Sequence, residues 1–181
     1  AGMNGAVMQM FNHGVITAML FLLVGMLYDR AHHRWIVFPD DYEDSEKSGK
    51  MGFGGVANKM PVFSAFVMVA FFAGLGLPGL SGFISEAFCF IGGFTAFKFI
   101  TVIGTFGILL NAVYFLRAYQ RIFWGEEGES SKDLTDISTR EISILIPLLL
   151  LVVGLGVYPS PLIEIIEPTI QSIIDTVQSV I

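Results

Sequence analysis

Two ionisable side chains lie inside long apolar stretches of the sequence, where a charge is costly. Glu86 is the only carboxylate between residues 61 and 97, and His13 is the only histidine within an apolar run, the one at 5–28. A charged residue at membrane depth costs about 2.5–3.5 kcal/mol on insertion scales and usually faces a bundle interior or a cavity. Carboxyl and imidazole groups exchange protons, so the two residues predict a proton relay. The alternative is structural: Glu86 bonded to a neighbouring helix, and His13 bonded to a backbone carbonyl or a serine.

Glycine and proline interrupt the apolar run that holds Glu86. Its 37 residues would extend about 55 Å as one helix, whereas the hydrocarbon core of a bilayer is about 30 Å thick. Pro78 lacks an N–H and Gly79 is a poor helix residue, so we predict one span that is broken between residues 74 and 82. Unwound backbone at this depth requires surrounding protein or a watery cavity, which favours an ion pathway. A re-entrant hairpin with both ends on one side is the alternative.

Further polar side chains could support such a pathway. Ser81 and Ser85 follow the break, and Tyr114 lies in the later part of the next apolar run. Redox chemistry has no evident centre, because the single cysteine, Cys89, cannot bind an iron–sulfur cluster alone and a bis-histidine haem needs two facing ligands. We therefore predict no catalytic residue, no metal and no cofactor in this chain.

The composition predicts an all-α integral membrane protein. Of the 181 residues, 54% are hydrophobic and only 14% are charged, too apolar for a soluble domain. About four transmembrane helices are expected, at residues 5–28, 61–97 with its break, 99–124 and 142–159. Isoleucine and valine recur at helical spacing in 161–181, which predicts an amphipathic C-terminal helix in the interface or against a neighbouring subunit. The sequence has no basic patch, which argues against nucleic-acid binding.

Charge placement gives a predicted orientation. Two polar loops, 29–60 and 125–141, separate the spans, and the acidic stretch 40–50 is expected to be a solvated insertion. If the run 61–97 crosses the membrane, nine of the ten lysines and arginines lie on one side, the cytoplasmic or matrix side. We expect a bacterial or archaeal cytoplasmic membrane, with the mitochondrial inner membrane as the alternative. The chain starts without methionine or a signal peptide, so it is expected to be the C-terminal part of a longer protein.

Several short motifs share one order and spacing. They are Asn-His-Gly at 12–14, Leu-Tyr-Asp-Arg at 27–30, Gly-Leu-Pro-Gly at 76–79, Glu86 and Tyr114. Together they resemble the chain M (subunit 4) family of antiporter-like membrane subunits of proton-pumping NADH:quinone oxidoreductase, respiratory complex I. The resemblance covers nearly the whole chain. It implies the last part of a 14-span antiporter-like fold that is built from two inverted repeats.

The resemblance also implies a function. Glu86 matches the buried titratable residue of the broken helix, where sister chains usually have lysine. A proton-translocating membrane-arm subunit is implied, driven by quinone reduction elsewhere, with NADH, FMN, iron–sulfur clusters and quinone in other subunits. Its implied partners are sister antiporter-like chains, other membrane-arm subunits and the lipid bilayer. The alternatives are a subunit of a sodium/proton antiporter or a membrane-bound hydrogenase, and a purely structural membrane subunit.

Overall fold

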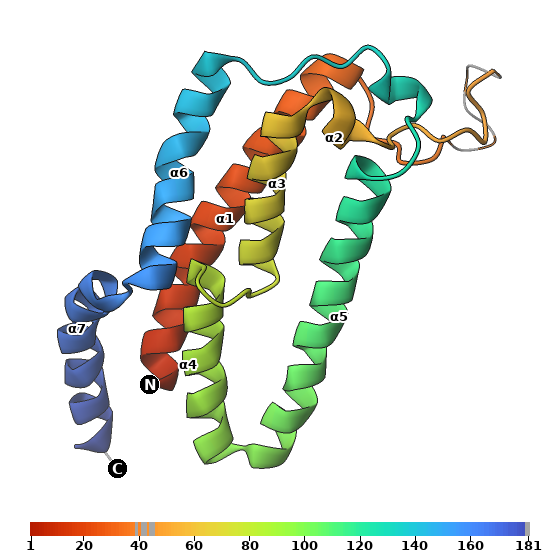
Figure 1. Cartoon of the computed structure of the whole chain (residues 1–181). Helices are drawn as coiled ribbons and strands as arrows, with labels where there is room; N and C mark the ends of the chain where they lie inside the picture. The colour runs from red at the N-terminus through yellow and green to blue at the C-terminus, as the bar shows by residue number, and fades with distance from the viewer. Residues whose placement is uncertain (39, 41–42, 44–45, 180–181) are drawn as a thin grey trace. The chain divides into compact units, whose positions relative to one another are not determined.

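Helices make up the regular structure of the described chain. The computed structural model describes every residue except 39, 41–42, 44–45 and 180–181. Figure 1 shows α1 (Gly2–Ala31), α2 (Val56–Lys59), α3 (Pro61–Gly74), α4 (Ser81–Ala96), α5 (Lys98–Phe123), the 3-10 turn η1 (Glu129–Ser131), α6 (Thr139–Val157) and α7 (Ser160–Gln178). The predicted fold class, an all-α chain with one interrupted helix and an amphipathic tail, is confirmed.

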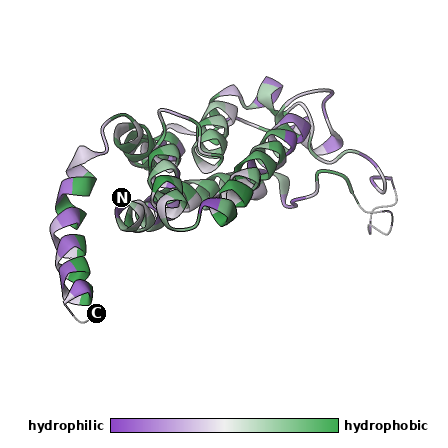
Figure 2. Cartoon of the chain, turned by 90° about the horizontal axis from the view of Figure 1, so that it is seen from below, coloured by the Kyte–Doolittle hydropathy of each residue, from purple (hydrophilic) through white to green (hydrophobic). Residues whose placement is uncertain are grey.

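Length and composition distinguish the helices. In the described part of the chain, α1, α5 and α6 are long and apolar enough to cross a membrane. The 14 residues of α3 and the 16 of α4 form two shorter apolar helices, one on each side of the break. Figure 2 shows polar and apolar residues on different sides of α7. Such a helix buries only one face, as at a membrane interface or against a partner.

Local hydrogen bonds set some helix ends outside the predicted bounds. Helix α6 begins at Thr139 rather than residue 142, because the Ser138 amide donates to Glu141 Oε2 (2.7 Å) and the Glu141 amide donates to Ser138 Oγ (3.4 Å). This reciprocal capping box satisfies amides of the first turn. Helix α1 is also longer than predicted, and α2 lies inside a loop for which no helix was predicted. Within the acidic stretch 40–50, residues 41–42 and 44–45 lie outside the described residues.

The chain divides into two compact units. The first comprises Ala1–Thr17, Phe72–Ala112 and Leu150–Ile181, and it contains the helix break. The second comprises Ala18–Phe71 and Val113–Leu149, and it contains the polar loops. Helices α1, α3, α5 and α6 each contribute residues to both units.

The second unit has a continuous apolar core. Tyr119 is one of the aromatic residues that pack in this core. Its ring stacks on Phe123 with centroids 4.6 Å apart, and its hydroxyl donates to the Ser64 carbonyl at 3.2 Å. The polar end of this buried ring is thus satisfied. The buried core residues are Met19, Leu23, Met26, Phe53, Val56, Met60, Phe63, Val67, Ala70, Tyr119, Phe123, Leu134, Ile137 and Leu145.

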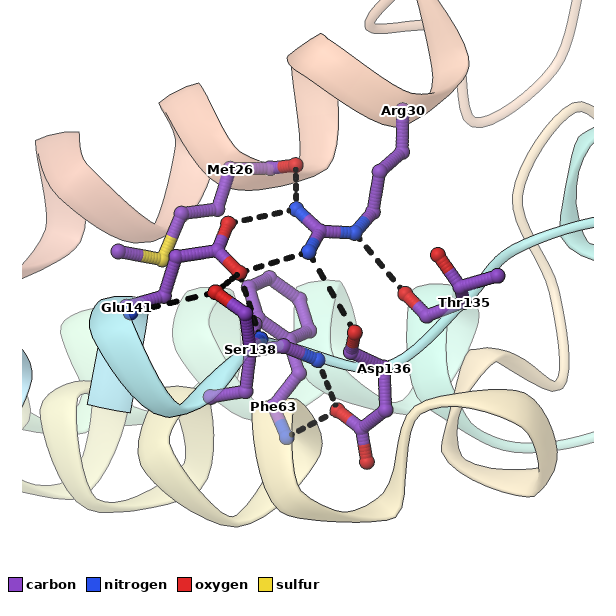
Figure 3. Close-up of polar contacts among 8 residues, drawn as sticks. Met26, Arg30, Phe63, Thr135, Asp136, Ser138 and Glu141 are labelled. Atoms are coloured by element: carbon purple, nitrogen blue, oxygen red, sulfur yellow. Dashed lines mark hydrogen bonds and ion pairs between the residues drawn. The ribbon is translucent and has the colours of Figure 1, made fainter.

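A charged cluster in the second unit ties three helix ends together (Figure 3). The two terminal nitrogens of Arg30 donate to the two carboxylate oxygens of Glu141, both at 2.8 Å. Arg30 also donates to the carbonyls of Met26 and Thr135, both at 2.9 Å. The Asp136 carboxylate accepts the first free amides of α3, those of residues 62 and 63, at 2.9 and 3.0 Å. The segment 135–141 therefore holds the end of α1 and the beginnings of α3 and α6.

His33 organises the loop that follows α1. Its Nδ1 accepts the Trp35 amide at 3.1 Å, so the neutral ring carries its proton on Nε2 and donates it to Ser130 Oγ at 2.5 Å. The ring stacks on Phe53 with centroids 4.7 Å apart. Burial lowers the pKa of His33 below its ordinary value, and the positive charge of Lys47 acts in the same direction.

This loop should loosen in acid. The unfolded loop binds more protons than the folded loop as the pH falls below the ordinary His33 pKa of 6.5, so its stability falls with falling pH. We expect faster hydrogen exchange at Phe38 and Gly52, whose amides donate to Lys50 and Ile36 carbonyls. Hydrogen–deuterium exchange of the native assembly, corrected for intrinsic rates, measures this. The pH dependence should vanish in His33→Phe and remain in His32→Asn; its survival in His33→Phe would contradict the assignment.

Candidate functional site

A Schellman motif ends α3 at the break. The Leu77 amide donates to the Phe72 carbonyl at 2.9 Å, and the Gly76 amide donates to the Ala73 carbonyl at 3.3 Å. Gly76 has a φ of 79°, the left-handed conformation that this motif requires and that glycine adopts without a Cβ penalty. The sequence therefore stops the helix with a specific cap.

A type II turn then leads into α4. The Leu80 amide donates to the Leu77 carbonyl at 3.1 Å, with Pro78 and Gly79 as the two central residues. Proline suits the first central position, and the second needs a positive φ, which Gly79 provides at 94°. Leu80 is extended, and α4 begins at Ser81 without a side-chain cap. Both candidate break residues named from the sequence thus have defined structural roles.

Asn111 satisfies a carbonyl that the break would otherwise leave free. In a continuous helix the Gly74 carbonyl would accept the amide of residue 78, but Pro78 has no N–H. Asn111 Nδ2 of α5 donates to this carbonyl at 3.0 Å. The sequence interpretation missed Asn111. Two features of the sequence could have identified it. Asn111 is an amide side chain in an apolar run, and a proline without an N–H leaves a backbone carbonyl in need of another donor.

Glu86 lies on α4 and its carboxylate packs against the break. It is half-buried, and a Cβ added at Gly76 would collide with its Oε2. Within the described residues, its carboxylate has no hydrogen-bond or ion-pair partner. A close backbone approach at Gly76 therefore places this acid beside unwound chain.

The structure places two of the candidate side chains, His13 and Tyr114, on exposed faces. His13 is exposed on α1, and the described residues show no hydrogen bond between it and Glu86. Tyr114 is 71% exposed on α5, where its ring meets Phe115 edge-on with centroids 5.8 Å apart. The predicted relay partners are thus not joined directly within this chain.

Ser81 and Ser85, by contrast, enter a buried polar cluster. Asn12 Nδ2 donates to the Ser81 carbonyl at 2.8 Å and to Ser85 Oγ at 3.1 Å. The Ser85 hydroxyl donates to Gln9 Oε1. Asn12 and Gln9 were missed as candidates, although their spacing of three residues puts both on one face of α1. Polar residues three apart in an apolar run were the available signal.

Metal binding has no support from the described residues. Among them, no three or more histidine, cysteine, aspartate or glutamate side chains come together in a way that could hold a metal ion. The expectation that this chain carries no cofactor stays a prediction.

Comparison with known proteins identifies the family. The profile described as "NADH:quinone oxidoreductase/Mrp antiporter, TM" matches residues 1–111, more than half of the chain. The chain belongs to this family. Together with its apolar helices, the match makes it an integral membrane protein. The family resemblance seen in the sequence motifs is confirmed.

Individual members of the antiporter family show how much of a full-length protein the chain covers. NADH-quinone oxidoreductase subunit M of Rhodobacter capsulatus is 37% identical over 174 residues, 96% of this chain and 31% of that protein. The Mycobacterium tuberculosis H37Rv subunit M is 35% identical over 176 residues, 97% of this chain and 29% of that protein. The chain therefore spans about a third of the length of these relatives.

Solved structures agree with the family fold. A chain of respiratory complex I from Thermus thermophilus with bound NADH matches with a TM-score of 0.74 and 29% identity, covering 86% of this chain and 30% of that one. A chain of the membrane-bound sulfane sulfur reductase, an archaeal respiratory membrane complex, matches with a TM-score of 0.68 and 22% identity, covering 86% and 24%. The second likeness concerns the fold alone.

Proposed function

We propose that this antiporter-family chain belongs to a proton-translocating membrane-arm subunit of NADH:quinone oxidoreductase, and that Glu86 carries the proton. The observation that carries the proposal is the Glu86 carboxylate packed against Gly76, where the helix is unwound. An acid without a partner among the described residues, at membrane depth and beside a broken helix, is typical of an ion pathway. The relatives named NADH-quinone oxidoreductase subunit M support the choice of complex.

The break gives Glu86 an electrostatic setting that a continuous helix lacks. The C-terminal carbonyl end of α3 and the uncapped N-terminal amide end of α4 meet there, so partial charges of opposite sign lie close together. Glu86 would take up a proton and release it as charges elsewhere in the complex change. His13, exposed on α1, would relay protons to groups outside this chain. NADH oxidation and quinone reduction would occur in other subunits.

A sodium/proton antiporter subunit is the second candidate, since the family description includes Mrp antiporters. The two functions differ in the driving reaction. An oxidoreductase subunit moves protons when NADH is oxidised, without sodium, whereas an antiporter exchanges sodium for protons without NADH.

Isolation from native membranes tests the proposed function. A tagged full-length protein should co-purify in detergent with flavin and iron–sulfur subunits. Membrane vesicles should take up protons when NADH is added in sodium-free buffer, and deletion of the subunit should abolish this uptake. Recovery of a lone monomer, or proton movement that needs sodium and not NADH, would reject the oxidoreductase assignment.

Gly76→Ala should impair proton uptake by displacing Glu86. The left-handed conformation costs alanine about 1–2 kcal/mol, and the added Cβ would also push the Glu86 carboxylate away. We expect an assembled complex with a several-fold lower NADH-driven proton uptake, measured in vesicles and compared with complex abundance on native gels.

Gly79→Ala is the control that separates backbone strain from displacement of the Glu86 carboxylate. Gly79 also has a positive φ, 94°, but nothing lies within 4 Å of its added Cβ. The two variants share the backbone strain, and only Gly76→Ala touches Glu86. Proton uptake should therefore fall much further in Gly76→Ala, and equal losses would remove the argument for a positioned carboxylate.

A further inference from the structure

A groove in the second unit runs between the later part of α1 and the beginning of α6. Its volume is about 890 Å³, within the roughly 300–1,000 Å³ that is typical of ligand sites. The side of α1 that lines it repeats at helical spacing, through Ala18, Leu22, Gly25 and Asp29. Ala18 precedes Asp29 by three helical turns, about 16 Å along the axis. The groove therefore extends over about half of a hydrocarbon core of about 30 Å, the depth of one lipid leaflet.

Polarity changes along the length of this groove. Exposed apolar side chains line one part of it: Phe21 and Leu22 of α1 are 79% and 37% exposed, and Ile144 of α6 is 43% exposed. Charged side chains line the other part, near the end of α1 and the beginning of α6, and they include Asp29 and Arg140. In an integral membrane protein this order places the apolar part in hydrocarbon and the charged part at the depth of the lipid headgroups.

The charged part of the groove offers one free anion and one free cation. Arg30 and Glu141 also line it, but they pair with each other at 2.8 Å. Asp29 and Arg140 are exposed, and within the described residues neither side chain has a hydrogen bond or an ion pair. The four charges sum to zero, so the groove does not favour a purely anionic ligand. A complementary ligand carries an anionic group for Arg140 and a cationic group for Asp29.

We propose that this groove binds one zwitterionic phospholipid of the phosphatidylethanolamine type. Arg140 binds the phosphate, for which a guanidinium group has matching geometry, and Asp29 accepts hydrogen bonds from the primary ammonium group. One acyl chain lies along Leu22 and Gly25. A lipid suits the groove better than a partner helix, because a transmembrane helix of another subunit crosses the whole hydrocarbon core and not one leaflet. The site lies outside the residues assigned to proton transfer.

Gly25→Leu fills the groove and tests the site. Gly25 is exposed, nothing lies within 4 Å of an added Cβ, and leucine favours a helix more than glycine does, so α1 should stay folded. Gly107→Leu is the matched control, because Gly107 is an exposed glycine of α5 with equally open space that does not line the groove. Cryo-electron microscopy of the native assembly should show a lipid headgroup between Asp29 and Arg140 in the unmodified protein and in Gly107→Leu. The lipid density should be lost in Gly25→Leu.

Lipid add-back tests which headgroup is bound. The native assembly is delipidated in detergent and incubated with phosphatidylethanolamine, phosphatidylcholine or phosphatidylglycerol, and mass spectrometry counts the lipid retained in excess of that in Gly25→Leu. Retention of phosphatidylethanolamine should exceed that of the other two several-fold, because a choline group cannot donate a hydrogen bond and glycerol carries no cation. Asp29→Asn should remove this preference, and Arg140→Gln should lower retention of all three lipids. Arg117→Gln, at an exposed arginine of α5, should alter none.

Contrary results would reject the site or its specificity. A protein helix in the groove of the unmodified assembly, or an empty groove, overturns the lipid site. Equal retention of phosphatidylethanolamine in the unmodified assembly and in Gly25→Leu also overturns it. A preference for phosphatidylglycerol that Asp29→Asn leaves unchanged overturns the zwitterionic ligand. None of these measurements uses NADH-driven proton uptake, so the proposed function and the lipid site can fail independently.

Discussion

Glu86→Gln is expected to assemble normally and to lose most NADH-driven proton uptake. Glutamine keeps the size of the side chain and its packing against Gly76, but it cannot ionise. A positioned proton-transfer group typically contributes about 10²–10⁴-fold, so little coupled activity should remain. Proton uptake and NADH-driven quinone reduction in membrane vesicles measure the loss, with assembly checked on native gels.

Two companion variants sharpen this result. Glu86→Asp should retain part of the uptake, because the acid survives on a shorter side chain. Glu164→Gln applies the same chemical change to an exposed acid of α7 and should leave uptake unaltered. A packing acid would behave differently: Glu86→Gln would pump fully, and Glu86→Ala would fail to assemble.

Arg30→Ala is expected to cause the largest loss of stability. The side chains of Arg30 and Glu141 are only 18% and 21% exposed, and they form a bidentate pair. Removing the arginine takes a donor from three backbone carbonyls and leaves the Glu141 carboxylate with Ser138 as its remaining partner. We expect a cost of about 2–3 kcal/mol, below the roughly 3–5 kcal/mol of a fully buried ion pair because both side chains keep some exposure. The temperature at which the complex loses this subunit, followed on native gels, measures it.

An exposed ion pair in the same unit is the control. Lys132 donates to Glu129 at 3.1 Å, but their side chains are 54% and 39% exposed. Lys132→Ala should therefore leave the stability of the subunit nearly unchanged. Arg30→Met combined with Glu141→Gln, which removes both charges, should be less harmful than Arg30→Ala. Equal effects of Arg30→Ala and Lys132→Ala would refute a stabilising role for the cluster.

Local chemistry explains which parts of the fold were predictable. Gly76, Pro78 and Gly79 break the helix through their own conformational preferences, so the break that was predicted between residues 74 and 82 is observed at residues 75–80. The start of α6 was also encoded locally, in the spacing of Ser138 and Glu141, but this signal was overlooked and the predicted bound was three residues late. Helix ends depend on such caps more than on hydropathy.

Hydrogen bonds between residues far apart in the sequence were harder to predict. The partners Asn12 and Ser81 are 69 residues apart, and Asn111 and Gly74 are 37 apart. A helix that is apolar on nearly all sides gives little indication of which face contacts which neighbouring helix. The spacing of apolar residues therefore could not predict which helices contact each other. The candidate site was predicted as far as its titratable residue, whereas the amides that support it emerged only from the fold. The roles of Glu86 and His13 stay predictions.

The cluster around Arg30 has a consequence for biogenesis. The partner of Arg30 is 111 residues later in the chain, so synthesis must continue for on the order of ten seconds before Glu141 emerges. During this interval the guanidinium at the end of α1 lacks its carboxylate, and α3 lacks the Asp136 cap that arrives with the same segment. A nascent chain released before this segment would keep an uncompensated charge at the membrane surface. Insertion chaperones and membrane proteases could therefore recognise an incomplete chain by its unpaired arginine.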